Sequence, residues 1–179
     1  MGNYKVIAMD VDGTLTNSQK QITRRTKEAL IKAQSQGAVL ILASGRPTTG
    51  LLDYAKELEM HKHNGLLVSY NGSKVVDCAT KEVLFNERMT IKQGQSVLKH
   101  MKSFDVKPMI DKDDYMYVND VYNNNIKYMG KSINIIEYEA RGGKFKLCEK
   151  EDLAAFADYP LNKILVAGDP EYLQEHYKA

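Results

Sequence analysis

The fold class can be inferred from the stretch Tyr4-Lys5-Val6-Ile7-Ala8-Met9-Asp10-Val11-Asp12-Gly13-Thr14-Leu15. Residues 4–9 are almost continuously apolar and rich in strand-forming types, and the run ends abruptly at Asp10. Runs of this kind are typical of a parallel strand that is buried on both faces of its sheet. We therefore expect a buried strand over 4–9, with the carboxylates of Asp10 and Asp12 directly beyond its end.

Helix and strand patterns alternate from this strand up to Gly72. Thr23 is suited to a helix N-cap, and the helical spacing of apolar residues after it ends near Gly37, a residue type common just beyond a helix. Apolar runs over 39–43 and 66–69 predict two further strands, with a helix that starts at Pro47 between them. This order predicts a Rossmann-like α/β core with a parallel sheet and right-handed crossovers.

Beyond Gly72 the pattern changes to short strands mixed with helices. We expect a hairpin from strands over 74–76 and 82–85, and then a helix capped by Thr90. The further elements that we expect are strands over 109–111, 115–118 and 163–167, helices over 151–157 and 171–177, and a turn at Gly142–Gly143. These patterns place a domain boundary near residue 86, with a core over 1–85 and an α+β domain over 86–179.

Composition limits the kinds of partner that the chain is suited to bind. Of its 179 residues 43% are hydrophobic and 27% are charged, and 25 basic against 23 acidic residues give a net charge of +2. The balance gives no reason to expect binding to nucleic acid or to an anionic membrane. Two cysteines are too few for a disulfide framework, and no signal peptide or membrane span is apparent, so we expect a soluble cytoplasmic protein.

Polar clusters follow three successive strands of the predicted sheet. They are residues 10–14, residues 44–46 and residues 71–72. Each alone is ordinary turn chemistry, but the carboxyl ends of parallel strands meet at one edge of a sheet, where ligands bind. The three clusters together therefore predict a functional site.

The residue types in these clusters suit the chemistry of phosphate esters. Asp10 is placed to attack a phosphorus atom or bind a cation, and Asp12 to move a proton to or from oxygen. Gly13 permits a tight turn with free N–H groups, Ser44 stands before the second helix as an anion site, and Arg46 adds a positive charge.

The sequence resembles the haloacid dehalogenase superfamily of phosphatases, in its Cof-type branch with an inserted α/β cap. The resemblance is carried by D-V-D-G-T-L at 10–15, S-G-R-P at 44–47 and Y-N-G at 70–72. It implies a cap domain over 86–179 that closes over the core and selects the substrate. It implies a Mg²⁺-dependent phosphatase of small phosphorylated metabolites, sugar phosphates above all, that works through an aspartyl-phosphate.

The resemblance also implies a role for each matched residue. Asp10 would be the nucleophile and Asp12 the general acid and base, and Mg²⁺ would be held by the Asp10 carboxylate and the Asp12 backbone carbonyl. The residues that would bind phosphate or border the substrate are Gly13, Thr14, Ser44, Gly45, Arg46, Asn71 and Gly72.

Two parts of the family pattern are not found, namely a later lysine and a G-D-x-x-N-D-like acidic segment. Gly168-Asp169-Pro170 is not taken for that segment because no second acid follows at the right offset. The resemblance therefore implies that the C-terminal part of the core is absent, which would leave the strand over 4–9 as an open apolar edge suited to self-association.

Two other functions stay open at this point. One is phosphoryl transfer between sugar hydroxyls, as in the phosphomannomutases, which share the D-V-D-G-T-L sequence. The other is a non-catalytic module that binds phosphate or a partner. Under the phosphatase interpretation too, the resemblance allows that this truncated chain is an inactive fragment.

Overall fold

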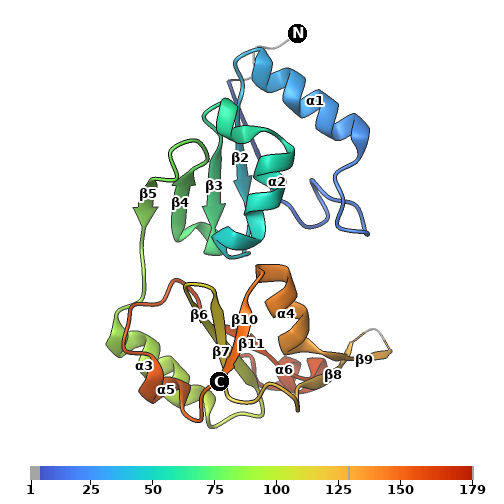
Figure 1. Cartoon of the computed structure of the whole chain (residues 1–179). Helices are drawn as coiled ribbons and strands as arrows, with labels where there is room; N and C mark the ends of the chain where they lie inside the picture. The colour runs from blue at the N-terminus through green and yellow to red at the C-terminus, as the bar shows by residue number, and fades with distance from the viewer. Residues whose placement is uncertain (1–4, 129, 179) are drawn as a thin grey trace. The chain divides into compact units, whose positions relative to one another are not determined.

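The computed structural model describes residues 5–128 and 130–178, and of Tyr128 only the backbone. The chain divides into two compact units, Met1–Glu87 and Arg88–Ala179, each of which has its own sheet (Figure 1). The two units are described separately below.

The first unit contains a five-stranded sheet in the order β1-β2-β3-β4-β5. The strands are β1 (Val6–Met9), β2 (Val39–Ala43), β3 (Leu66–Ser69), β4 (Lys74–Asp77) and β5 (Val83–Asn86). The first three are parallel, and β4 and β5 continue the sheet as an antiparallel hairpin. The prediction of an α/β fold with a parallel sheet is confirmed; Tyr4, the first residue of the predicted strand, lies outside the described residues.

The helices of this unit are α1 (Arg24–Ser35) and α2 (Leu52–Glu57), with short 3-10 turns η1 (Thr48–Leu51), η2 (Met60–Lys62) and η3 (Tyr70–Gly72). Thr23 caps α1 by accepting a hydrogen bond from the Thr26 backbone N–H, and Gly37 follows the helix with φ +93°. The prediction that the second helix starts at Pro47 is wrong. Pro47 is extended (ψ 158°), the chain then makes the 3-10 turn η1, and α2 begins only at Leu52.

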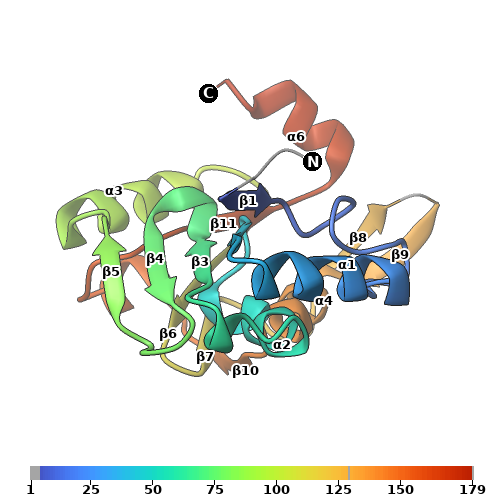
Figure 2. The same ribbon diagram turned by 90° about the horizontal axis from the view of Figure 1, so that it is seen from above.

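One face of this sheet forms the core of the unit. Leu40, Leu42 and Leu67 are buried there together with Leu51 and Leu58 from the helical segments. Figure 2 shows α1 and α2 on the same side of the sheet.

Strand β1 does not have the burial that we expected on both of its faces. Ile7 and Met9 pack against the core, but Val6 on the opposite face is 54% exposed. The expectation is wrong because β1 is an edge strand that pairs only with β2, and its second face has no packed layer among the described residues.

The second unit contains a four-stranded sheet in the order β10-β7-β6-β11 and a separate hairpin, β8–β9. The strands are β6 (Lys107–Lys112), β7 (Tyr115–Val118), β8 (Asn125–Tyr128), β9 (Lys131–Asn134), β10 (Lys146–Glu149) and β11 (Leu165–Ala167). The helices are α3 (Ile91–Met101), α4 (Ile135–Gly143), α5 (Leu153–Phe156) and α6 (Pro170–His176).

The turn expected at Gly142–Gly143 is wrong, because both glycines form the last turn of α4. Asn134 caps this helix by accepting from the Glu137 N–H, and Ile136 is buried against the sheet. The helix ends at Lys144, whose φ of +61° is left-handed. Burial on the sheet therefore outweighs the low helix propensity of two adjacent glycines.

Gly65, just before β3, is a position where only glycine fits. A Cβ there would lie 2.6 Å from the Met60 Cβ, and Met60 is fully buried. We expect Gly65→Ala to destabilise the protein by about 1–3 kcal/mol, as other overpacked sites do. Urea unfolding followed by circular dichroism measures this, with Gly142→Ala as the control, since a Cβ at Gly142 meets no atom. Equal midpoints for the two variants would contradict the steric argument.

Candidate active site

The second and third polar clusters are joined by backbone hydrogen bonds beyond β2 and β3. The Asn71 N–H donates to the Ser44 carbonyl at 3.1 Å, and the Tyr70 N–H donates to the Arg46 carbonyl at 2.9 Å. The predicted residues of these two clusters therefore lie side by side at one edge of the sheet.

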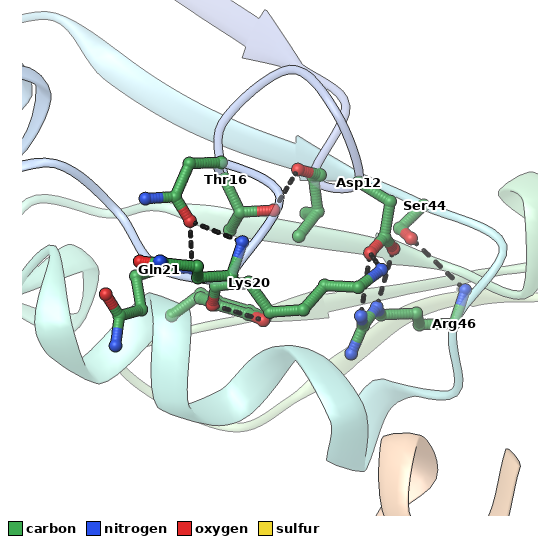
Figure 3. Close-up of polar contacts among 10 residues, drawn as sticks. Asp12, Thr16, Lys20, Gln21, Ser44 and Arg46 are labelled. Atoms are coloured by element: carbon green, nitrogen blue, oxygen red, sulfur yellow. Dashed lines mark hydrogen bonds and ion pairs between the residues drawn. The ribbon is translucent and has the colours of Figure 1, made fainter. Parts of the chain in front are cut away.

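The first cluster is joined to the second by an ion pair between Asp12 and Arg46 (Figure 3). The Arg46 Nε donates to Asp12 Oδ2 at 2.7 Å and its Nη2 donates to Oδ1 at 2.8 Å. Bidentate pairs of this kind fix orientation as well as distance. All three predicted clusters thus converge, although Asp12 and Arg46 lie 34 positions apart.

The loop after β1 is held by its own backbone. The Leu15 N–H donates to the Asp10 carbonyl at 3.2 Å, and the Thr16 N–H and hydroxyl both donate to the Val11 carbonyl, at 3.0 and 2.9 Å. Gly13 has φ +82°, which glycine adopts without strain. Because Val11 and Leu15 are buried, the residues between them are presented outward on a fixed turn.

Asp10 and Thr14 are exposed on this loop. Their side chains make no hydrogen bond or ion pair with the other described residues, so no contact brings them to Ser44 or Arg46. The Asp10 carboxylate is therefore accessible, whereas the Asp12 carboxylate is fully engaged.

The turn after β3 has an unusual backbone. Tyr70, Asn71 and Gly72 are left-handed in succession, with φ of +52°, +58° and +101°. Such conformations cost non-glycine residues about 1–2 kcal/mol each and persist only where surrounding contacts impose them. Here the imposing contacts include buried Ser69, whose hydroxyl lies 2.8 Å from that of Thr48. Strain that is maintained in this way is a feature of functional sites.

Lys20 is a site residue that the sequence did not indicate. Its Nζ donates to Asp12 Oδ1 at 2.6 Å (Figure 3). The backbone of Lys20 is left-handed, with φ +61°. Asn17 folds the loop that presents it, since its Oδ1 accepts from the N–H groups of Gln19 and Gln21. No spacing rule relates Lys20 to Asp12, because the contact depends on this loop conformation.

The charge of Asp12 follows from these contacts. Hydrogen bonding to Arg46, with a smaller contribution from Lys20, holds the pKa of the Asp12 carboxyl well below its usual range, against a partial burial that would raise it. Asp12 is therefore ionised in this arrangement, and two cations converge on it. An anion that enters the site would compete with Asp12 for both cations.

The donor set fits Mg²⁺ only in part. Mg²⁺ is held in proteins by one or two carboxylates and keeps several waters, and the accessible Asp10 carboxylate can serve as one such ligand. Among the described residues, no group of three or more His, Cys, Asp or Glu side chains gathers at any place. The residues present therefore supply one accessible carboxylate that fits Mg²⁺ as a ligand.

Asp169 has a structural role. This agrees with the sequence, in which Gly168-Asp169-Pro170 is not assigned to the family's later acidic segment. It caps α6 and accepts a hydrogen bond from the Glu171 N–H at 3.0 Å.

Comparison with known proteins gives several matches. A family model described as haloacid dehalogenase-like hydrolase matches residues 7–179. The chain is 37% identical over 81 residues to YxeH of Bacillus subtilis (strain 168), over 45% of this chain and 30% of that protein. It is 30% identical over 75 residues to the 5-amino-6-(5-phospho-D-ribitylamino)uracil phosphatase YcsE of the same organism, over 42% of this chain and 29% of the relative.

Solved structures give the same result for the fold. The crystal structure of a haloacid dehalogenase-like hydrolase from Bacteroides thetaiotaomicron matches with a TM-score of 0.81 and 30% identity, over 96% of this chain and 61% of that chain. The matches thus cover 30% and 29% of the two curated relatives and 61% of the chain in the solved structure. No helix in the described part of the chain combines the length and apolar character that a membrane span requires.

Proposed function

We propose that this chain, which belongs to the haloacid dehalogenase-like hydrolase family, is the part of a phosphatase that attacks small phosphorylated metabolites through Asp10, with sugar phosphates as the main substrate class. The observation that carries the proposal is the convergence of Asp12, Ser44 and Arg46 beyond the strand whose end presents an accessible Asp10 carboxylate. The name of YcsE, which describes a phosphorylated ribityl compound as substrate of that relative, supports the class.

The chemistry assigned to the chain has two steps. The Asp10 carboxylate attacks phosphorus and the bond from phosphorus to the ester oxygen breaks, while Asp12 gives a proton to the departing alcohol. Asp12 then takes a proton from a water molecule that attacks the aspartyl-phosphate, which releases inorganic phosphate and restores Asp10.

Arg46, Lys20 and Ser44 bind the phosphoryl group in this scheme. The phosphate competes with Asp12 for the two cations, and their withdrawal raises the pKa of Asp12 toward the range in which it can carry a proton. The Ser44 hydroxyl accepts from the Arg46 N–H at 3.2 Å, which leaves its own proton available for a phosphate oxygen.

Asp10 and the Asp12 carbonyl would hold Mg²⁺. A divalent cation supplies charge neutralisation between an attacking carboxylate and a phosphate dianion. In the same proposal residues 1–85 are the catalytic core and residues 86–179 the cap that excludes water and selects the substrate.

One experiment separates this function from its two alternatives. A sugar phosphate that carries a radioactive phosphoryl group is incubated with the protein and Mg²⁺. Label in inorganic phosphate supports the phosphatase, and label on a second sugar hydroxyl supports a phosphomannomutase-like transferase. Binding of the sugar phosphate with no release from it or from an aryl phosphate supports a non-catalytic module.

Arg46 gives a prediction of its own. We expect Arg46→Met to lower kcat/KM by about 10²-fold, the usual cost of removing one charge-stabilising donor. Arg46→Lys keeps the charge without the fork, so we expect it to recover part of the loss. Steady-state kinetics on one phosphate ester measures all three proteins. An unchanged kcat/KM in Arg46→Met would show that this side chain only restrains Asp12.

The open edge of β1 leads us to propose that the chain self-associates through this strand. The edge of β1 away from β2 pairs with no strand among residues 5–128 and 130–178, and with the exposed Val6 it forms a template for another strand. We expect the protein to elute as an oligomer and Val6→Lys to shift it toward monomer, as measured by light scattering after gel filtration. Leu52→Lys, at an exposed helix position, is the control. A monodisperse wild-type monomer would contradict the proposal.

A further inference from the structure

The four-stranded sheet of the second unit has two differently covered faces. On one face Met116 and Val118 of β7 are buried beneath Ile136 and Ala140 of α4. The alternate residues of β7 are tyrosines and point to the other face, where α3 and α5 pack (Figure 1). Tyr115, at the open end of that face, is 39% exposed.

The strand register places lysines on both sides of this exposed tyrosine. Lys112 of β6 pairs with Tyr115, and Tyr115 in turn pairs with Lys146 of β10. Directly opposed residues lie on the same face of a sheet, so the three side chains form one row. In the next row Tyr117 lies between Ile110 and Cys148.

Aromatic rings continue from this row as a ladder. The ring centroids of Tyr115 and Tyr117 are 6.0 Å apart, those of Tyr117 and Phe156 are 4.4 Å apart, and those of Phe156 and Tyr159 are 6.2 Å apart. We call Tyr115, Tyr117, Phe156 and Tyr159 the aromatic ladder. Its members come from β7 and from the segment around α5, so the fold brings them together from separate stretches of the sequence.

Three ammonium groups lie over these rings. The Lys112 Nζ is 4.5 Å from the centroid of Tyr159, the Lys146 Nζ is 5.5 Å from that of Tyr115, and the Lys150 Nζ is 4.8 Å from that of Phe156. None of the three forms an ion pair with another residue in the described ranges, whereas Lys102 of the same unit pairs with Asp152. These cations are available to an anion.

The ladder also contains a polar atom that lacks a partner. The Tyr159 hydroxyl is buried and forms no hydrogen bond with the described residues. Burial raises the pKa of Tyr159, as do Asp111 and Asp158 nearby, so the hydroxyl keeps its proton and remains a donor. A buried donor without an acceptor is costly, but this oxygen is not exposed at the surface, so it is not among the groups that contact a bound molecule.

We propose that the aromatic ladder and its three lysines form a binding site for a planar aromatic ring that carries an anionic group, such as a phosphorylated heterocycle. The ring of the bound molecule stacks on the exposed face of Tyr115, and the lysine ammonium groups bind its anionic group in place of water. The site lies within the second unit and uses none of the residues assigned to phosphate ester chemistry.

A small molecule suits this surface better than a nucleic acid strand does. Nucleic acid sites combine stacking rings with a basic track that follows the backbone over several nucleotides. Here burial raises the pKa of Tyr159 and the charges of Asp111, Asp113 and Asp158 raise it further, so acidic groups lie near the lysines, and strand β7 has only four residues. The charges around the ladder therefore suit one anionic group better than a chain of phosphates.

The test uses the full chain with Asp10→Asn, so that bound esters are not turned over, and calorimetry with three probes. We expect uridine 5′-monophosphate to bind about tenfold more tightly than either uridine or ribose 5-phosphate, because only the first has both ring and anion. We expect Tyr115→Ala and Lys146→Gln each to weaken its binding severalfold. Tyr138→Ala, at an exposed position of α4, should not change it.

Two further measurements distinguish this site from the proposed active site. Addition of Arg46→Met to the Asp10→Asn chain should leave the difference in affinity between uridine 5′-monophosphate and ribose 5-phosphate unchanged, and loss of that difference would place the nucleotide at Arg46 and overturn the inference. Affinity that rises steadily with the length of an oligouridylate would assign the surface to nucleic acid. Absence of uridine 5′-monophosphate binding would also overturn it, and hydrolysis by Asp10 is measured separately with a sugar phosphate and the wild-type chain.

Discussion

Asp10→Asn is expected to abolish phosphate ester hydrolysis, with a loss of about 10⁴-fold or more by analogy with other covalent nucleophiles. The amide has nearly the same shape as the carboxylate but is not a nucleophile toward phosphorus. Since the Asp10 side chain makes no hydrogen bond or ion pair with the described residues, the substitution should leave the fold intact. Hydrolysis of a sugar phosphate with Mg²⁺ present measures the loss, and Asp114→Asn, at an exposed turn position, is the matched control.

The covalent intermediate allows a second, independent measurement of the same role. Acid quenching during turnover should trap one phosphoryl group on the wild-type chain, located by mass spectrometry to the peptide that contains Asp10. The Asp10→Asn chain should carry none. Hydrolysis that survives the substitution, or a phosphoryl group found on another residue, would show that Asp10 is not the nucleophile.

The parts of the fold that the sequence predicted are those with strong local signals. The apolar runs at 39–43 and 66–69 became β2 and β3, and Thr23 caps α1, because burial and side-chain capping act over a few residues. The grouping of Asp12 with Arg46 was predictable for a related reason, since the carboxyl ends of parallel strands meet at one sheet edge.

The parts that the sequence did not predict depend on tertiary context. Val6 is exposed because β1 lies at the sheet edge. The open edge was expected from the resemblance, but the apolar run of the strand itself indicated burial on both faces. Helix α4 ends in Gly142 and Gly143, which by propensity indicate a turn, but burial of its apolar residues against β7 and the Asn134 cap favour the helix. Lys20 reaches Asp12 with its own backbone in the left-handed conformation. Glycine is the residue that usually indicates this conformation, and it does not stand at this position.

Asp12→Asn is expected to have the second largest effect, and its size should depend on the leaving group. Removal of a general acid costs about 10²–10⁴-fold where the departing oxygen needs a proton. A sugar phosphate has such an alkoxide leaving group, and we expect a loss in that range. An aryl phosphate such as 4-nitrophenyl phosphate leaves as a stabilised phenolate, so its first step should be affected far less.

The same substitution should then slow the second step, because Asp12 also takes the proton from water. With 4-nitrophenyl phosphate, the Asp12→Asn chain should release a burst of nitrophenol equal to the enzyme present and then turn over slowly. Stopped-flow absorbance measures the burst. Lys20→Met is the control, because it removes a partner of Asp12 and keeps the acid, and it should show no such burst. If Asp12→Asn lowers the rate equally on both substrates and no aspartyl-phosphate accumulates, Asp12 does not transfer a proton. Its role would then be limited to its ion pair with Arg46.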